Sequence, residues 1–388
     1  MTEKLSAEEL KALVLQVFEP TNEDRGIAIL VDLPDARKPD HDAWRDRREM
    51  AREWAEVLAE ARHEIGVPEI LLCLYPNVGA NNAELPSRVA LLLPGDPLPE
   101  HASDIDPNLL VPLDQLFARC TIAIAPTELS ATAPLKIAAR TTGIRGVTMP
   151  GFSPAMLPAL RLDYPAVDRQ IMHLKSLLDR AEGARLEFLV RGVERHDLFL
   201  DLRHRSSHAS GGRRTDRGNV GNLPPGETYI VPYEGEIAGD PTRSEGVLPV
   251  QLDGEVVLYR IEANTAVDVI STGPRSDAER ALIVQEPAYA NIAELGFGVL
   301  AQHGIEPCGE VLLDEKLGLH VAFGRSDHFG GQVGPSRFSE PGAVVHIDRV
   351  YLPQMQPDVH VLEVGLVFAG DEELTLMRDG VYAVPLGE

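Results

Sequence analysis

The sequence predicts an α/β N-terminal domain with a mostly parallel sheet, followed by an α+β C-terminal domain rich in antiparallel strands. The chain has 388 residues, which is more than one typical core accommodates. Up to residue 183 strand and helix signals alternate, which is typical of a parallel sheet covered by helices. From residue 184 onward, short strands and hairpin turns dominate. We therefore expect domains at residues 1–183 and 184–388.

The first 183 residues contain one especially clear helix signal. At 42–65, Trp44, Trp54 and Leu58 recur at helical spacing. No G-x-G-x-x-G and no Walker loop follows any expected strand, so no motif supports a nucleotide-binding fold. The other expected helices are at 1–18, 113–118, 131–141 and 168–181, and the expected strands are at 26–33, 69–75, 88–93, 120–125 and 146–149.

The second half has a different pattern. Asp253-Gly254 separates two strand-like runs and has the residue types of a two-residue hairpin turn. A helix is expected from Ser276 through Ala290, with Glu279 at the capping-box position. The expected strands are at 186–191, 197–202, 228–233, 247–252, 255–261, 344–352, 359–367 and 373–377.

Composition argues against several classes of partner. The net charge of −24 is unsuited to nucleic acid or to an anionic membrane surface. No run approaches the ~18 apolar residues needed to span a bilayer. The three cysteines show no framework spacing, and the acidic start of the chain lacks a basic signal region. We therefore expect a cytoplasmic protein, with Cys73 and Cys120 in the core.

One strand-like run carries a pair of metal-ligand residue types. In the run VVHID, His346 and Asp348 are two residues apart, and side chains at this spacing lie on the same face of a strand. Val345 and Ile347 then lie on the opposite face. By itself the pair is more typical of a half-buried strand whose polar face meets solvent, so a metal site requires further ligands elsewhere in the chain.

A second feature is a cationic segment in an acidic protein. Residues 203–219 contain five arginines and two histidines, His204 and His208. One interpretation is a solvated, mobile loop. The other is a lid or substrate clamp, because arginine side chains bind carboxylates through paired hydrogen bonds.

Further carboxylates stand in unusual settings. Glu294 lies inside an apolar segment, where an isolated carboxylate is costly unless it is paired or bound to a cation. Glu227 directly precedes a strand, and the alternative to metal binding there is a turn or capping role. For Glu294 the alternative is a buried ion pair. Four carboxylates and two imidazoles match a site for two divalent cations with a bridging carboxylate. The candidate metal ligands are Glu227, Glu294, Glu315, His320, His346 and Asp348.

The same ordered motifs resemble a known family. NLPPGE, AELGFG, DEKLGLHVAFG and VVHID look like the motifs of the metallo-aminopeptidases of peptidase family M29, the aminopeptidase T group. The resemblance is strongest over residues 183–350. It implies that these six residues bind two ions, zinc or cobalt. It also implies an N-terminal α/β domain, a C-terminal catalytic metal-binding domain and a homodimer.

The chain departs from that family at one position. The resemblance implies a catalytic tyrosine about seven residues after the first metal histidine, but Asp327 and His328 stand there. Of the two, His328 can donate a hydrogen bond to a developing oxyanion, and ionised Asp327 cannot. A second group that this chain resembles, the 2,5-dihydroxypyridine dioxygenases, holds one Fe(II) with two histidines and an aspartate. These would be His320, His346 and Asp348, which match a facial triad.

Three functional hypotheses follow. The first is a metal-dependent hydrolase of aminopeptidase type acting on a small peptide, with Glu227, Glu294 and Asp348 as candidate bridging or bidentate ligands and Glu227 or Glu315 as general base. The second is an Fe(II) dioxygenase that cleaves a small hydroxylated aromatic or N-heteroaromatic ring. The third, motivated by the missing tyrosine, is a non-catalytic binding protein stabilised by metal. The candidate catalytic residues are Glu315, His328 and Asp327.

Overall fold

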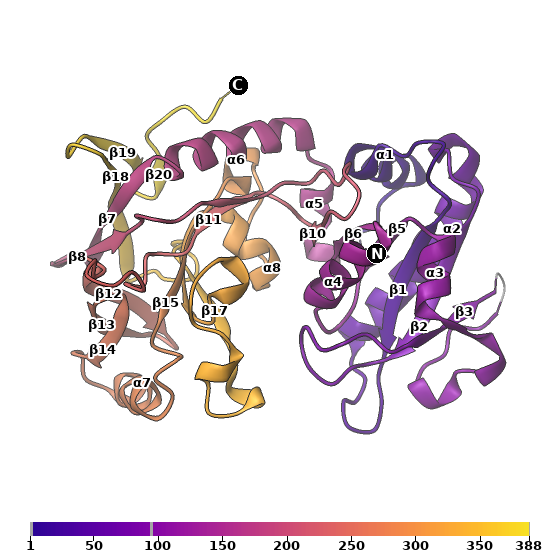
Figure 1. The fold of residues 1–388 in the computed structure, drawn as a ribbon, viewed down its shortest axis with the longest axis horizontal. Coiled ribbons are helices and arrows are strands. Elements are labelled where there is room, and N and C mark those ends of the chain that lie inside the picture. Colours follow the sequence, from indigo (N-terminus) through magenta and orange to yellow (C-terminus); the bar gives the residue numbers. More distant parts are fainter. Residues whose placement is uncertain (1–2, 94–95, 388) are drawn as a thin grey trace. The chain divides into compact units, whose positions relative to one another are not determined.

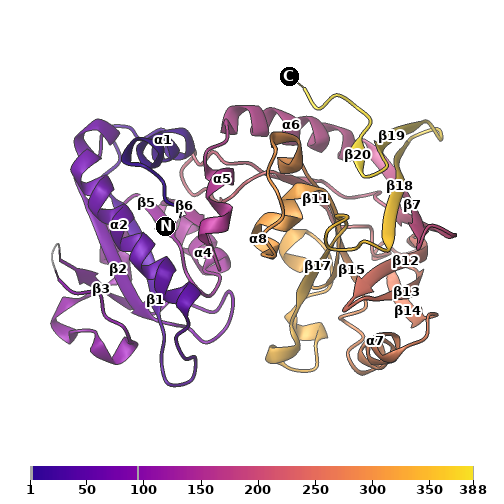
Figure 2. The same cartoon turned by 180° about the vertical axis from the view of Figure 1, so that it is seen from behind.

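The computed structural model describes residues 3–93 and 96–387. The chain forms two compact units, shown from opposite sides in Figures 1 and 2. Unit 1 comprises Met1–Pro165 and Gly212–Pro225, and unit 2 comprises Ala166–Gly211 and Gly226–Glu388. Relative to the expected domains 1–183 and 184–388, residues 166–183 group with unit 2 and residues 212–225 return to unit 1.

Unit 1 is built on a seven-stranded sheet in the order β10-β6-β5-β1-β2-β3-β4. The neighbours from β10 to β2 are parallel, and β3 and β4 add antiparallel strands at one edge. Every residue of β1 is buried, as expected for a strand covered on both faces. The strands are β1 (Ile27–Leu33), β2 (Ile70–Pro76), β3 (Arg88–Leu92), β4 (Leu110–Pro112), β5 (Ile122–Ala125), β6 (Arg145–Thr148) and β10 (Val220–Asn222).

The helices of unit 1 follow the expected order. Helix α2 (Asp42–Ile65) has the predicted bounds, and its Trp44, Trp54 and Leu58 are buried. Helix α1 begins at Ala7, because Ser6 and Glu9 form a capping box; residues 1 and 2 of the predicted helix lie outside the described part. The remaining helices of this unit are α3 (Leu113–Arg119), α4 (Thr132–Thr142) and α5 (Leu157–Leu160).

Unit 2 contains two antiparallel sheets. The larger has the order β14-β13-β12-β8-β7-β18-β19-β20, and the smaller has the order β17-β16-β15-β11-β9. The larger sheet contains β7 (Ala181–Val190), β8 (Glu194–Asp201), β12 (Glu245–Leu252), β13 (Glu255–Glu262), β14 (Thr265–Val269), β18 (Val359–Phe368), β19 (Glu373–Arg378) and β20 (Val381–Tyr382). The smaller contains β9 (His208–Ser210), β11 (Glu227–Ile230), β15 (Ile292–Gly298), β16 (Leu319–Gly324) and β17 (His346–Val350).

The predicted hairpin turn at Asp253-Gly254 is confirmed. It joins β12 to β13 with positive φ values of 48° and 81°, as a type I′ turn requires.

Two helix predictions in this part of the chain need correction. Helix α6 spans Tyr164–Leu178 rather than 168–181, because residues from Ala181 onward pair with β8 and β18. Helix α7 spans Pro274–Gln285 with Gly273 at its N-cap, not Ser276 to Ala290. The Ser276 hydroxyl instead donates to Glu255 at 2.6 Å, and Glu279 accepts hydrogen bonds from two buried tyrosines. The third helix of unit 2 is α8 (Val311–Asp314).

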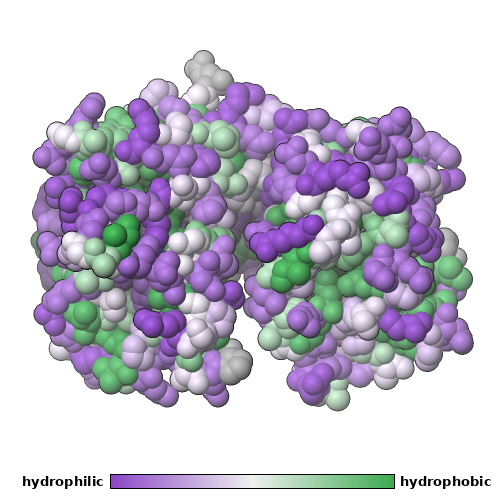
Figure 3. All heavy atoms as spheres, in the orientation of Figure 1, coloured by the Kyte–Doolittle hydropathy of each residue, from purple (hydrophilic) through white to green (hydrophobic). Residues whose placement is uncertain are grey.

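Two of the three cysteines lie where the sequence predicts them, and the surface shown in Figure 3 is mostly hydrophilic. Cys73 and Cys120 belong to the core of unit 1, and all three cysteines are free thiols. The face in Figure 3 is mostly hydrophilic, with apolar side chains scattered over it. No helix in the described part of the chain is long and apolar enough to cross a membrane.

Candidate metal centre

Five of the six candidate ligands lie on the smaller sheet of unit 2. Glu227 begins β11, Glu294 lies on β15, His320 lies on β16, and His346 and Asp348 lie on β17. Because directly paired residues of antiparallel strands point to the same face, the register determines which side chains meet. Ala322 pairs with Glu294 on one side and with Asp348 on the other. The pairing therefore gathers the five ligands on one face.

Small residues on the same face make room for the ligands. Gly296 pairs with His320 across the strands, and Gly298 pairs with Glu227. A Cβ on Gly296 would lie 1.9 Å from His320 Nε2, so no larger residue fits without moving the imidazole. Along 294–298 and 320–324 the ligands, Gly and Ala occupy every second position and large apolar residues occupy the positions between them, which is a strand signal that the sequence carries.

The ligand atoms form two groups that share Glu294. Glu227, Glu294 and His320 make one group, and Glu294, His346 and Asp348 make the other, with the ligand atoms of each group within 4.8 Å of one another. Glu294 Oε1 lies 3.1 Å from His320 Nε2, and Glu294 Oε2 lies 3.3 Å from His346 Nε2. This carboxylate therefore directs one oxygen to each group, which is the geometry of a bridging ligand.

The two histidines present their Nε2 atoms to the carboxylates. His346 Nδ1 lies 2.7 Å from the carbonyl oxygen of Arg325, and His320 Nδ1 lies 3.4 Å from that of Gly318. A carbonyl only accepts, so Nδ1 carries the proton and Nε2 is the atom free to bind a cation. Together with the carboxylates, this donor set fits divalent cations such as zinc, cobalt or iron.

Glu315 and Lys316 complete the cluster from the short 3₁₀ turn Glu315–Leu317. Lys316 has no exposed surface; its Nζ lies 3.2 Å from Glu227 Oε1, and it forms an ion pair with Glu315. Glu315 belongs to neither group of three ligands. Lys316 lies in the motif DEKLGLH but is not among the residues predicted from the sequence, because lysine is not a metal-ligand residue type.

Burial and neighbouring charges shift the pKa values of the groups in the cluster. Burial by itself lowers the pKa of His320, but the hydrogen bond that its ring donates to Glu294, together with the charges of Glu294, Asp348 and Glu227, raises that pKa to about 9. Burial likewise opposes the charged form of Glu294, yet His320 and His346 lower its pKa. Burial raises the pKa of Glu315 to about 8. The metal-free cluster therefore binds protons where a cation would otherwise lie.

The solvent-facing side of the cluster carries His328 and Asp327. The His328 ring lies edge-on to His346, with 5.4 Å between ring centroids. Burial, followed by the charge on His346, lowers the pKa of His328 to about 4, so it is neutral at pH 7. Asp327 accepts a hydrogen bond at 2.6 Å from Arg325 and belongs to neither ligand group. The catalytic roles of His328 and Asp327 stay predictions.

The loop that carries His328 is anchored by the buried carboxylate of Glu234. This group accepts hydrogen bonds from Ser326 Oγ at 2.6 Å and Asn291 Nδ2 at 2.9 Å, and also from the backbone amide of Gln332. The Ser326 hydroxyl in turn accepts from the amide of Val333 at 3.2 Å. These bonds hold the loop, and therefore His328, close to the cluster.

Aromatic side chains line up beside His346. Phe329 lies 5.7 Å from the His346 ring and 4.7 Å from the Tyr229 ring. His208, one of the two histidines of the arginine-rich segment, stacks on Tyr229 at 5.2 Å, and its Nε2 lies 2.9 Å from the Phe329 carbonyl oxygen. The other, His204, interacts with Asp240 at 2.8 Å.

The arginine-rich segment contains a short strand and two arginines that form ion pairs. Its residues 208–210 form β9, and Arg203 and Arg205 are largely buried in ion pairs. Arg203 bonds Asp201 and Asp240, and Arg205 bonds Glu234 and Glu236. These two arginines neutralise carboxylates of unit 2, and the role of a lid or clamp stays a prediction.

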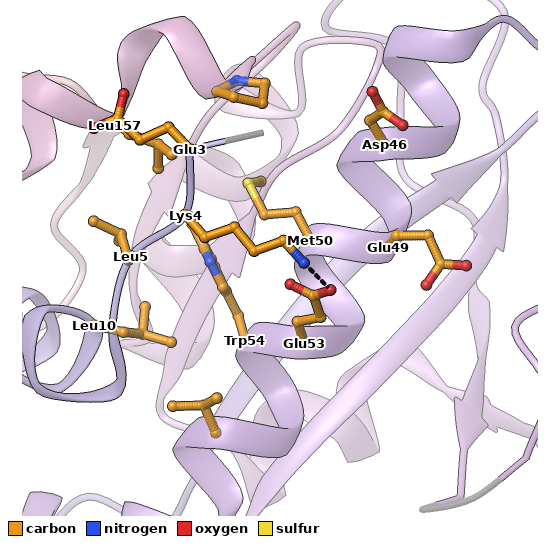
Figure 4. Close-up of a pocket in the computed structure, with 12 residues that line it drawn as sticks. Glu3, Lys4, Leu5, Leu10, Asp46, Glu49, Met50, Glu53, Trp54 and Leu157 are labelled. Atoms are coloured by element: carbon orange, nitrogen blue, oxygen red, sulfur yellow. Dashed lines mark hydrogen bonds and ion pairs between the residues drawn. The ribbon is translucent and has the colours of Figure 1, made fainter. Parts of the chain in front are cut away.

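A separate hollow of about 190 Å³ lies in unit 1 (Figure 4). Leu5, Leu10, Met50 and Trp54 line it together with the ion pair between Lys4 and Glu53, whose atoms are 2.5 Å apart. As far as the chain is described, its lining contains no histidine or cysteine. The candidate chemistry therefore belongs to unit 2.

Comparison with solved structures identifies two similar folds. The first is 2,5-dihydroxypyridine dioxygenase from Pseudomonas putida KT2440, with a TM-score of 0.61 and 12% identity over 98% of this chain and 99% of that chain. The second is AmpT from Thermus thermophilus, with a TM-score of 0.55 and 17% identity over 97% of this chain and 99% of that chain. No family model and no curated protein matches the chain. At these identities the likeness establishes a shared fold.

Proposed function

We propose that this chain is a metal-dependent hydrolase of aminopeptidase type that uses two divalent cations. The observation that carries the proposal is the position of Glu294, whose two carboxylate oxygens face His320 at 3.1 Å and His346 at 3.3 Å. A carboxylate shared by two ligand groups is the arrangement expected of a two-metal hydrolase. The fold similarity to AmpT is consistent with this proposal.

Each of the two ligand groups would hold one cation. Glu227, Glu294 and His320 would hold one cation, and Glu294, His346 and Asp348 the other. Cations at such positions polarise a carbonyl group and activate water near neutral pH.

Two further groups would handle protons and charge. Glu315 would serve as general base once cations are bound, because their charge favours the ionised carboxylate, whereas in the metal-free protein burial raises its pKa to about 8. Neutral His328 donates an N–H hydrogen bond to the oxygen on which negative charge develops, in place of the tyrosine that the M29 resemblance implies.

A metal titration combined with a hydrolysis assay tests the proposal. Metal-free protein is titrated with Zn²⁺ or Co²⁺, and hydrolysis of aminoacyl p-nitroanilides is followed at each ratio. We expect uptake of two equivalents and activity that requires both. Saturation at one equivalent, or selective uptake of Fe(II) with oxygen-dependent turnover, would reject the two-metal hydrolase.

A second candidate is supported by the aromatic side chains beside His346. Tyr229 and Phe329 offer stacking partners for a planar ring, and no tyrosine stands at position 327 or 328. An Fe(II) ring-cleaving dioxygenase would use His320, His346 and Asp348. Its test is oxygen consumption after anaerobic Fe(II) loading, with 2,5-dihydroxypyridine and catechol-like compounds; absence of consumption with all of them eliminates this candidate.

A further inference from the structure

The buried lysine gives the cluster an unequal distribution of charge. Lys316 Nζ lies 3.2 Å from Glu227 Oε1, while Glu227 Oε2 faces His320 Nε2 at 3.7 Å. One carboxylate therefore serves both a fixed ammonium group and the first ligand group. Lys316 is fully buried, so water does not screen its charge from a neighbouring cation.

Among the described residues, no ammonium group is paired directly with the second ligand group, although the charge of Lys316 contributes, after the larger effects of burial, His346 and His320, to the lowered pKa of Asp348. In the described part of the chain, no lysine or arginine forms an ion pair with Glu294 or Asp348. Asp348 Oδ1 lies 3.6 Å from His346 Nε2 and belongs to this group alone. A cation bound by Glu294, His346 and Asp348 therefore competes with no ammonium group for its ligands.

We propose that Lys316 makes the two metal positions unequal, so that a divalent cation binds tightly to Glu294, His346 and Asp348 and weakly to Glu227, Glu294 and His320. This inference rests on the proposed two-metal function. A cation at the weak position shares Glu227 with the ammonium group and is repelled by it. One cation together with Lys316 also neutralises most of the carboxylate charge, so a second cation gains less. Lys316 is a positioning residue, because it acts through Glu227 and Glu315.

Metal binding to the full chain tests the inference independently of turnover. Metal-free protein is titrated with Co²⁺ alone, with stoichiometry from equilibrium dialysis and occupancy from visible absorption. In the wild-type chain we expect two steps whose dissociation constants differ by at least about tenfold. Glu227→Gln should abolish the weak step, and Asp348→Asn should abolish the tight step.

Replacement of Lys316 by an uncharged residue should remove the difference between the two dissociation constants. Lys316→Met keeps the length of the side chain without its charge, and the weak step should tighten by at least about tenfold while the tight step changes less. Lys316→Arg should preserve the gap. As a matched control, Arg47→Met removes another buried cation, which pairs with Glu128 at 2.6 Å in unit 1, and should leave both steps unchanged.

The possible outcomes separate the two claims. A Lys316→Met protein whose weak step is unchanged overturns the inference, as does a wild-type chain with two equal steps. If Lys316→Met does not fold, the wild-type titration decides, and loss of the tight step in Glu227→Gln overturns the inference. Failure of the proposed function shows differently: the fully loaded wild-type chain does not hydrolyse aminoacyl anilides.

Discussion

The two ligand groups of the candidate centre differ in their surroundings although they share Glu294. His320 is completely buried and lies among strands β11, β15 and β16, whereas the side chain of His346 is 19% exposed on the edge strand β17. The buried group contacts Lys316, and the open group contacts His328. The contrast shows that two groups joined by one carboxylate differ in burial and in neighbouring charge, so each half can be tested separately.

Glu294→Gln should have the largest effect, because Glu294 alone belongs to both halves. The amide presents one acceptor and no charge, so we expect metal uptake to fall at both positions and activity to fall by more than about 100-fold, beyond the effect of losing an outer-shell partner. Metal content after dialysis and initial rates measure this. Glu363→Gln, at a carboxylate that bonds Arg378 and Thr375 on the larger sheet, is the control. Normal metal content in Glu294→Gln would contradict the bridging role.

Gly296→Ala should disturb only the buried ligand group, through His320. The added Cβ would lie 1.9 Å from His320 Nε2, so the ring must move and we expect a loss of about 1–3 kcal/mol in the free energy of unfolding. Binding at the position served by His320 should weaken while that at Asp348 persists. Denaturant unfolding and Co²⁺ titration measure the two effects. Gly365→Ala, where a Cβ meets only the Leu374 carbonyl at 4.0 Å, should be tolerated; equal behaviour of the two variants would contradict the prediction.

His328→Ala tests the open half. Because His328 contacts the ring of His346 and is not a member of either ligand group, metal content should be unchanged. The rate constant kcat should fall by about 100-fold if its N–H supports the developing oxyanion. Steady-state kinetics with equal metal loading provide the measurement. A variant with full activity would remove His328 from the mechanism.

The smallest expected effect is the pH dependence of the metal-free protein. The pKa of His320 is raised to about 9, whereas an unfolded histidine titrates near 6.5. The folded state therefore holds more protons than the unfolded state between these values, and stability is lost as the pH rises from 6.5 to 9. Glu315, with a pKa raised to about 8, acts in the same direction between pH 4.5 and 8.

Melting temperatures measured with and without Zn²⁺ check this pH dependence. The loss should be weaker in the metal-loaded protein, because a bound cation replaces the protons. A metal-free melting temperature that rises between pH 6.5 and 9 would contradict the assignment of these proton sites.

Local patterns predicted much of the fold. Helix α2 has the predicted bounds because its long amphipathic stripe fixes one buried face. The turn at Asp253-Gly254 follows from residue types that tolerate positive φ. The sequence does not predict strands β15 and β16 clearly, because their residues are buried throughout, and their alternation sets large apolar residues against Gly, Ala and single ligand residues rather than against a polar, solvent-facing side. Strand β10 joins the sheet of unit 1 from a distant part of the chain, which no local signal indicates.

The sequence by itself named six residues of metal-ligand type, and the two-residue spacing placed His346 and Asp348 on one face of a strand. The structure gathers five of the six into two groups and leaves Glu315 outside both. Only the tertiary structure decided which of those residues form each ligand group and which neighbours they contact. Strand register selects Glu294 as the carboxylate between two groups, and the fold brings the Lys316 ammonium to Glu227. The physical reason is that residue type and local period fix what a side chain can bind, whereas its partners depend on pairings between segments far apart in the chain.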